Sequence, residues 1–185
     1  EMSGGGALID IGIHSLDRTL YVLGYPKPET AWGAAYLMLP HLAAPGGMLF
    51  GASSAASAEI NVEDLAAGML RFKNGLTLIF EASFAINRPE VFYYTELYGE
   101  KGGARIDRDK SLVLWRDEQG TLTETTPAYD LAFQPELIYE RQLAEFRRRI
   151  IHNDLSEHEH DEAVAVMRII DAVYRSARSG SPEAV

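Results

Sequence analysis

The stretch GGGALIDIGIHSLD, residues 4–17, decides how the rest of this chain is organised. Its three consecutive glycines allow the backbone to turn tightly and to approach a neighbouring element closely. The apolar run that follows carries Asp10 and His14 four residues apart, with Asp17 three residues later. At about 3.6 residues per turn, a helix places these three side chains and Tyr21 in one narrow stripe.

A second, apolar stripe lies about a quarter-turn away on the same predicted helix. Its members are Ile13, Leu16, Leu20 and Leu23. The helix can therefore pack one side into a core and present a carboxylate–imidazole–carboxylate row to a cleft. Gly24 is a typical helix stop, and Pro26 and Pro28 disfavour a restart.

The polar stripe suits proton transfer. An imidazole, with its ordinary pKa of about 6.5, exchanges protons close to neutral pH. A carboxylate one turn away can fix its tautomer or bind a substrate hydroxyl. Two other interpretations remain open on spacing alone. In one, Asp10 caps the helix and His14 is a half-buried surface residue. In the other, Asp10 and His14 share a metal ion, which the absence of cysteine and of a second nearby histidine disfavours.

Composition indicates a globular protein and argues against several classes of partner. The chain has 185 residues, which suits a single domain, with 17 Lys+Arg against 27 Asp+Glu and a net charge of −10. This acidity disfavours nucleic acid and anionic membranes as partners. Without cysteine there is no disulfide framework and no thiolate zinc site, which fits a cytoplasmic protein. No apolar run reaches the roughly 20 residues that a membrane span requires.

The remaining sequence predicts strands followed by two helices. A strand is expected over 30–39, then a long loop over 41–57. The Asn74-Gly75 pair predicts a hairpin between strands at 65–72 and 76–84. Further strands are expected at 91–98, 104–107, 112–116 and 122–126, and their short connections favour antiparallel pairing. The fold class predicted is α+β: an open, mostly antiparallel sheet with helices packed on one face.

Two amphipathic helices close the sequence. The first carries apolar residues at helical spacing: Tyr139, Leu143, Phe146 and Ile150. Ser156 and Glu159 match a capping box that would start the second helix. We expect its buried side to consist of Ala163, Val166, Met167, Ile170, Val173, Tyr174 and Ala177.

Five segments in register resemble the C-terminal domain of one family, the glucose–fructose oxidoreductase / inositol dehydrogenase / rhizopine-catabolism (Gfo/Idh/MocA) oxidoreductases. They are residues 4–17, 61–64 (NVED), 70–75 (LRFKNG), 81–84 (EASF) and 98–103 (YGEKGG). The final helix, ending at 174–180 (YRSARSG), is similar to the closing helix of that domain. The resemblance thus covers nearly the whole chain.

The resemblance implies a function. Members of the family pair an N-terminal Rossmann domain for NAD or NADP with a C-terminal α/β domain. The Rossmann domain and its Glu-Lys-Pro lysine are absent from this chain, so we expect no cofactor-binding residues here. By resemblance His14 is the acid/base at the substrate hydroxyl, Asp10 orients it or binds substrate, and Asp17 supports binding. The implied reaction oxidises a secondary hydroxyl of a sugar, inositol or related polyol. The open sheet face is expected to form a homo-dimer or higher homo-oligomer.

Two other functions stay open. The chain could be a sugar-binding or dimerisation module that kept the fold and lost the chemistry. A metal-assisted hydrolase or isomerase built on Asp10, His14 and Asp17 is a more distant alternative.

Overall fold

A computed structural model describes residues 5–38, 61–84, 86, 93–107, 111–127, 135–154 and 158–185 of the chain. The chain divides into two units. The first combines Glu1–Pro89 with His158–Val185, and the second is Glu90–Glu157. The predicted loop at 41–57 and the predicted helix cap at Ser156 lie outside the described residues.

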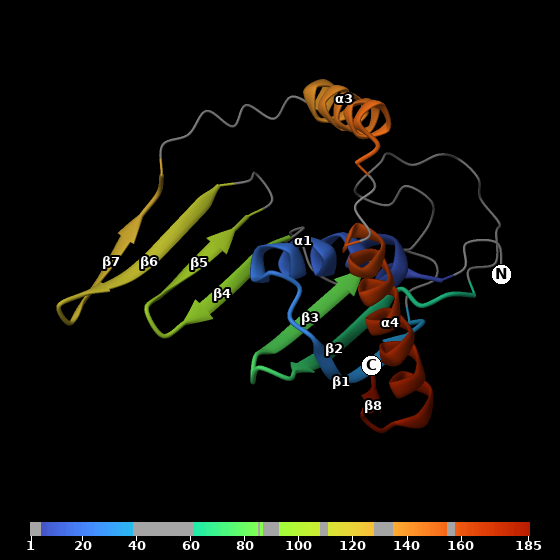
Figure 1. Ribbon diagram of the computed structural model, residues 1–185. Coiled ribbons are helices and arrows are strands. Elements are labelled where there is room, and N and C mark those ends of the chain that lie inside the picture. The colour runs from blue at the N-terminus through green and yellow to red at the C-terminus, as the bar shows by residue number, and fades with distance from the viewer. Residues whose placement is uncertain are drawn as a thin grey trace. The chain divides into compact units, whose positions relative to one another are not determined.

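The first unit is an antiparallel sheet with helices (Figure 1). Its helical elements are η1 (Leu8–Gly12), α1 (Ile13–Leu23) and α4 (His158–Ser179). Its strands are β1 (Pro28–Tyr36), β2 (Leu65–Phe72), β3 (Thr77–Ser83) and β8 (Glu183–Ala184), in the order β3-β2-β1-β8. The hairpin predicted at Asn74-Gly75 joins β2 to β3, and the N–H of Leu76 donates to Oδ1 of Asn74 at 3.2 Å.

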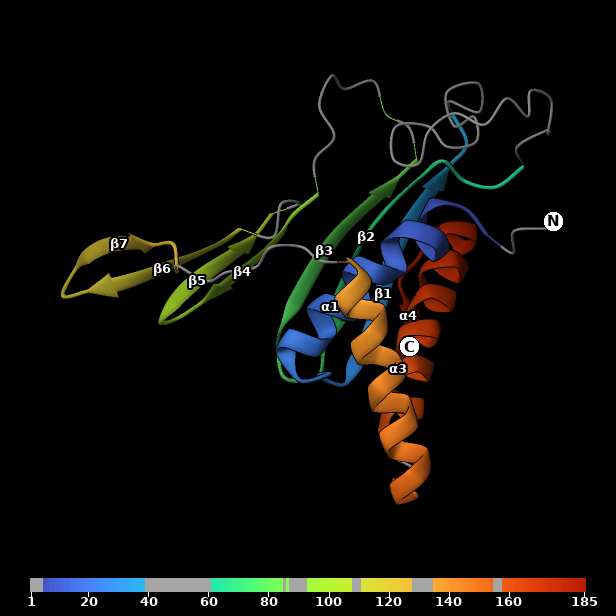
Figure 2. The ribbon, with the colours of Figure 1, turned by 90° about the horizontal axis from the view of Figure 1, so that it is seen from above.

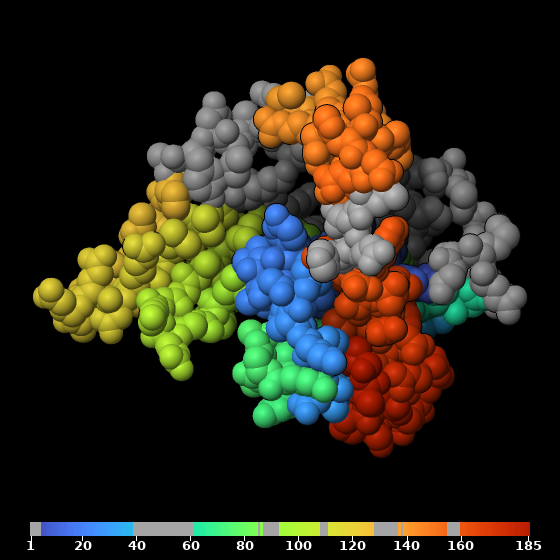
Figure 3. Space-filling view, viewed as in Figure 1, coloured from blue at the N-terminus to red at the C-terminus, as the bar shows by residue number. Residues whose placement is uncertain are grey.

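The core lies between one face of this sheet and the helices. Inward positions alternate along the strands and pair in register, as in Ala31 with Leu70 and Ala66 with Ala82. Helix α4 packs on β1 and η1 packs on β3, both on this face. Figure 2 shows α1 and α4 on the same side of β1, β2 and β3, and Figure 3 shows them as adjacent ridges. The largest fully buried apolar side chains are Phe72, Leu8, Leu20, Leu70, Ile169, Ile170 and Val173.

Helix α4 approaches β1 closely at Gly33. A Cβ built on Gly33 would lie 2.6 Å from Cγ1 of Val173, closer than real side-chain contacts allow. The N–H of Gly33 donates to Oγ of Ser176 at 3.0 Å in the buried interior. A glycine on the strand and a serine on the helix therefore set the depth at which α4 sits on the sheet.

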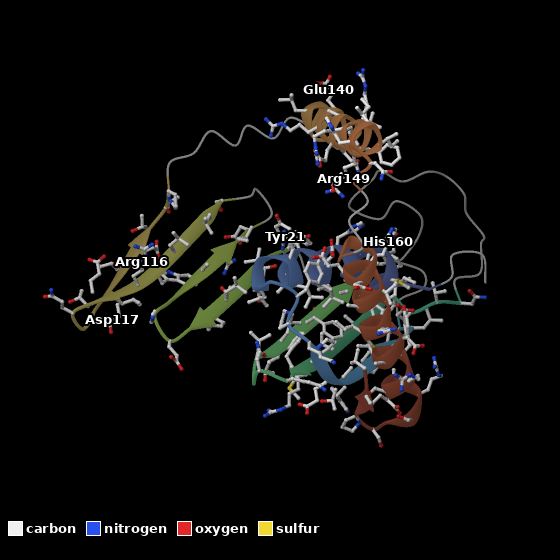
Figure 4. The ribbon with its side chains drawn as sticks, in the orientation of Figure 1. Tyr21, Arg116, Asp117, Glu140, Arg149 and His160 are labelled. Atoms are coloured by element: carbon white, nitrogen blue, oxygen red, sulfur yellow. The ribbon has the colours of Figure 1, made fainter. Side chains whose placement is uncertain are left out.

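The second unit contains a separate four-stranded antiparallel sheet in the order β4-β5-β6-β7. The strands are β4 (Thr95–Gly99), β5 (Gly102–Ile106), β6 (Leu112–Glu118) and β7 (Thr121–Thr125), and helix α3 (Pro135–His152) follows. Arg105 of β5 pairs with Glu96 at 3.0 Å and Asp107 at 2.8 Å. Figure 4 marks Asp117 at the β6–β7 turn, where its Oδ1 accepts the N–H of Gly120 at 2.6 Å.

The predicted α+β class is confirmed, and every strand pairing in the described part of the chain is antiparallel. The strand predicted at 30–39 runs from Pro28 to Tyr36. The one predicted at 91–98 is described as Thr95–Gly99, and 91–92 lie outside the described residues. None of the helices described is long and apolar enough to cross a bilayer.

The predicted buried side of α4 was too wide. Met167 is 45% exposed and Ala163 is also exposed, so both predictions were wrong. The buried stripe is centred on Val166, Ile170 and Val173 at spacings of four and three residues. Met167 follows Val166 by one residue, about 100° around the helix, which places it on the flank.

Candidate active site

The segment that carries Asp10 and His14 begins as a single π-helical turn. In η1 the N–H of Ile13 donates to the carbonyl of Leu8, five residues earlier, and α1 continues without a break. A π turn holds more residues than an α turn, and such turns are frequent at functional sites. Because of the wider turn, Asp10 and His14, which are four residues apart, point in more nearly the same direction from the helix axis than they would in an uninterrupted α-helix.

Burial confirms the predicted polar stripe in full and the predicted apolar stripe in part, because Ile13 and Leu23 are only half-buried. Asp10, His14, Asp17 and Tyr21 are all exposed, and Figure 4 labels Tyr21 on α1. Leu16 and Leu20, on the other stripe, are buried in the core. The carboxylate–imidazole–carboxylate row is thus exposed, while the opposite side of the helix packs into the core through Leu16 and Leu20. The cleft predicted in front of this row stays a prediction.

Asp17 has a partner within the chain. The hydroxyl of Tyr25 donates to Oδ1 of Asp17 at 2.6 Å. Burial and this hydrogen bond raise the pKa of Tyr25 well above its usual range. Tyr25 follows Gly24, and its N–H donates to the carbonyl of Leu20 at 2.8 Å to close the helix end. Asp17 therefore ties down the C-terminal end of α1, whereas Asp10 and His14 occupy its start.

The start of the helix is held by Glu63. Its Oε2 accepts the N–H of Gly6 at 3.0 Å, and its Oε1 accepts the N–H of Leu8 at 3.1 Å. Its main-chain carbonyl accepts the N–H of Ala7 at 3.1 Å. The hydroxyl of Tyr174, on α4, also donates to Oε1 at 2.6 Å. Burial, followed by this hydrogen bond, raises the pKa of Tyr174 well above its usual range.

Gly6 is needed where Glu63 lies against it. A Cβ on Gly6 would collide with the carbonyl oxygen of Glu63. The glycine cluster thus permits a close approach of main chain to main chain, which is one of the two uses that its composition predicts. The N–H groups of Gly6 and Leu8 at this turn are therefore hydrogen-bonded to a side chain of the same protein, the carboxylate of Glu63.

The helix start formed by Gly6, Ala7 and Leu8 does not fit the pyrophosphate of a nicotinamide dinucleotide. Such a cofactor places its pyrophosphate on free N–H groups at a helix N-terminus that follows a strand. Here the N–H groups of Gly6, Ala7 and Leu8 all donate to Glu63. A carboxylate already occupies the position where a phosphate would bind. In the part of the chain that the structure describes, no group of three or more potential metal ligands is found.

Comparison with known proteins identifies the family. A family model described as "Oxidoreductase family, C-terminal alpha/beta domain" matches residues 1–185. The chain therefore belongs to the Gfo/Idh/MocA oxidoreductase family, and the match is to its C-terminal domain.

Individual relatives agree with this assignment. The chain is 29% identical over 182 residues to the D-glucoside 3-dehydrogenase of Escherichia coli K12, covering 98% of this chain and 49% of that protein. An oxidoreductase domain protein from Kribbella flavida has a similar structure, with a TM-score of 0.76 at 22% identity over 98% of this chain and 52% of that one. A levoglucosan dehydrogenase in complex with NADH and L-sorbose gives a TM-score of 0.75 at 19% identity, over 98% and 50% of the two chains. The chain spans about half the length of the curated relatives that it matches.

Glu63 is the site feature that sequence reasoning missed. In the sequence it stands out only as part of the NVED segment, residues 61–64, that resembles the family. It lies 55 residues from Leu8 and 111 from Tyr174, so no local pattern could link them. The π turn was also missed, because its sequence has ordinary helical spacing.

Proposed function

We propose that this chain is the substrate-binding and catalytic domain of an NAD(P)-dependent oxidoreductase acting on a secondary hydroxyl of a sugar, inositol or related polyol. The observation that carries the proposal is the exposed Asp10–His14 pair, four residues apart on a helix whose other side is buried. Membership of the family and likeness to sugar dehydrogenases support the substrate class.

His14 is the proposed acid/base. Oxidation of a hydroxyl to a carbonyl requires the oxygen to lose its proton, and an imidazole accepts a proton near neutral pH. Asp10 is one turn away and can accept a hydrogen bond from the substrate or hold the imidazole in one tautomer. Asp17 takes a supporting role in substrate binding, at the far end of the same stripe, where Tyr25 already fixes its carboxylate.

NAD or NADP would be held mainly by chain outside these 185 residues. When bound, a nicotinamide accepts the hydride that leaves the carbon atom. The relative solved with NADH and L-sorbose supports a nicotinamide in the full protein. Its name, like that of the E. coli relative, supports a carbohydrate as the other partner. The cytoplasmic location stays a prediction from the cysteine-free sequence.

The test is turnover of the full-length protein with NAD or NADP and a panel of sugars and polyols. His14→Ala removes the proton acceptor, and a general acid/base is worth about 10²–10⁴-fold in rate. We expect a loss of that order in kcat, with the unfolding midpoint preserved because His14 is exposed. Asp10→Ala should lower turnover as well.

His160→Ala is the matched control, since His160 is an exposed histidine on α4 and lies outside the α1 stripe. It should retain full turnover. Unchanged turnover in both His14→Ala and Asp10→Ala would contradict the catalytic assignment. Full-length protein that binds sugar without any nicotinamide would instead favour the non-catalytic binding module.

We also propose a homo-oligomer formed through the open face of the first sheet. Trp32, Met69 and Ile79 lie side by side on β1, β2 and β3, in register and on the face opposite the core. They are 44%, 45% and 81% exposed. Large apolar patches rarely stay open to water, and a flat face of this kind can pair with itself about a two-fold axis.

Light scattering on the full-length protein tests the oligomer. Ile79→Lys puts a charge at the most exposed point of the row and should shift the molar mass toward that of a monomer. Lys73→Glu changes a charge at the exposed β2–β3 turn and should leave the mass unchanged. A wild-type protein that is monomeric at high concentration would refute this interface.

A further inference from the structure

We propose that Glu63 is a positioning residue for the Asp10–His14 pair. It acts by fixing the first turn of the helix that carries them. The inference rests on the proposed function, because it assigns a supporting role for the reaction of those two residues.

The first observation is the number of donors that converge on one side chain. Three hydrogen atoms point at the carboxylate of Glu63: those of the Gly6 N–H, the Leu8 N–H and the Tyr174 hydroxyl. The adjacent main-chain carbonyl takes a fourth, from Ala7. A carboxylate hydrogen-bonded at both oxygens has one orientation, so it holds the donors in one geometry as well.

The second observation is a short path from Glu63 to Asp10. Gly6 donates its N–H to Glu63, and its carbonyl accepts the N–H of Asp10 at 3.1 Å. Only one residue, Gly6, therefore separates the Glu63 carboxylate from the main chain of Asp10. Any rotation of the first turn that releases Glu63 changes the direction of the Asp10 side chain and, one turn later, that of His14.

The third observation is that Glu63 is anchored from both sides. The Tyr174 hydroxyl ties it to α4, whose Val166, Ile170 and Val173 are buried in the core. The negative charge also faces the positive end of the helix dipole, which favours this placement. The Glu63 carboxylate thus fixes the position of the start of η1 relative to the core of the unit.

Glu63→Gln in the full-length protein tests the role. The substitution conserves volume but replaces one accepting oxygen by an NH₂ group, which then faces donors on Gly6, Leu8 or Tyr174. We expect kcat to fall about tenfold or more, since small misplacements of reacting groups can cost about 10²-fold. KM should change much less, because the binding surface remains.

Two companion variants separate positioning from general destabilisation. Ser176→Ala removes a buried hydrogen bond of the same unit without touching η1, and it should lower the unfolding midpoint with kcat unchanged. Combining Glu63→Gln with Asp10→Asn forms a double-mutant cycle. If Glu63 acts through Asp10, the loss in kcat caused by Glu63→Gln should be smaller in the protein that already lacks the Asp10 carboxylate.

Amide hydrogen exchange gives a readout that is independent of activity. Glu63→Gln should speed exchange at Leu8 and Asp10, whereas Ser176→Ala should not. Unchanged exchange at Leu8 and Asp10 in Glu63→Gln would overturn the positioning role. A normal kcat in Glu63→Gln, with His14→Ala inactive, would do the same. Either result leaves the proposed function intact. Full activity in His14→Ala overturns both.

Discussion

The N–H of Gly33 and the hydroxyl of Ser176 form a 3.0 Å hydrogen bond between the first strand and the last helix. This hydrogen bond forms because the edge strand β8 is short. β8 pairs with β1 only at Thr30 and Ala31, so it ends before it reaches Gly33. The N–H of Gly33 would otherwise be a buried donor on an uncovered edge. A helix side chain thus completes the hydrogen bonding of a sheet.

Removing that hydroxyl should destabilise the protein. Ser176→Ala leaves the Gly33 N–H buried without its acceptor, and such a loss costs about 1–3 kcal/mol. Urea unfolding followed by circular dichroism measures the change. Ser179→Ala, at an exposed serine on the same helix, should cost less than half as much. Equal losses for the two serines would count against this account.

Gly33→Ala should also destabilise, through overpacking against Val173. The added Cβ has no room at 2.6 Å from Cγ1 of Val173, and overpacking of this kind costs about 1–3 kcal/mol. The double variant Gly33→Ala/Val173→Ala frees that space, so its free energy of unfolding should exceed the value expected from adding the two single losses. Strict additivity in the same unfolding assay would mean that the contact is not the cause.

Leu70→Ala should lower the free energy of unfolding by about 2–5 kcal/mol, because Leu70 is fully buried between the sheet and its helices. Leu122 is a strand leucine that is 75% exposed, and it provides the comparison. Leu122→Ala should change stability by less than about 0.5 kcal/mol, as expected for an exposed position. Denaturant titration of both variants gives the two values directly.

Two tyrosines should make the fold sensitive to alkali. The pKa values of Tyr25 and Tyr174 are raised in the folded state, by burial and by their carboxylate partners Asp17 and Glu63. The folded state therefore holds protons that the unfolded state releases above the ordinary tyrosine pKa of about 10. Their contribution is complete below that pH and is lost as the pH rises beyond it.

The expected result is a fall in the free energy of unfolding above pH about 10 that is shallower in Tyr174→Phe than in the wild-type protein. Urea titrations at a series of alkaline pH values measure the slope. Identical slopes in the two proteins would show that Tyr174 ionises normally.

On α3, Glu145 should titrate unusually low. Hydrogen bonds from Arg148 and Arg149 lower its pKa to about 2. Arg148→Ala should move it part of the way back toward the ordinary value of about 4.3, since Arg149 remains. Carboxyl carbon chemical shifts measured against pH would report both values. Added salt should raise the wild-type pKa, because both partners are exposed, and insensitivity to salt would contradict this origin.

Local patterns predicted much of the fold. The period of the first helix separated Leu16 and Leu20 from Asp10 and His14, because burial on a helix follows residue spacing. The Asn74-Gly75 pair located its hairpin, because a tight turn is determined by the residues within it. Both are short-range properties, and both are confirmed.

Features that depend on distant contacts were not predictable. β8 is two residues long and exists because the end of the chain reaches β1, where Arg175 donates to Glu183 and to the carbonyl of Ala184. Met167 was misassigned because the width of a buried stripe depends on how deeply the helix sits, which Gly33 determines. The hydrogen bonds of Glu63 join three segments that are far apart in the sequence. The sequence therefore indicated Asp10 and His14 as candidate site residues but not the side chain that supports their helix.

The division of the first unit into Glu1–Pro89 and His158–Val185 has a consequence for synthesis on the ribosome. β1, β2 and β3 are translated before Glu90–Glu157, yet the residues of α4 that pack on β1 are translated only after it. Until then the face that carries Ala31, Leu70 and Phe72 lacks α4 and has only η1 and α1 beside it, so the newborn sheet is open to mispairing or to chaperones. The second unit, whose strands are sequential neighbours, can complete its own meander first. Within this chain, the second unit is therefore expected to finish folding before the first unit, whose last helix is translated after it.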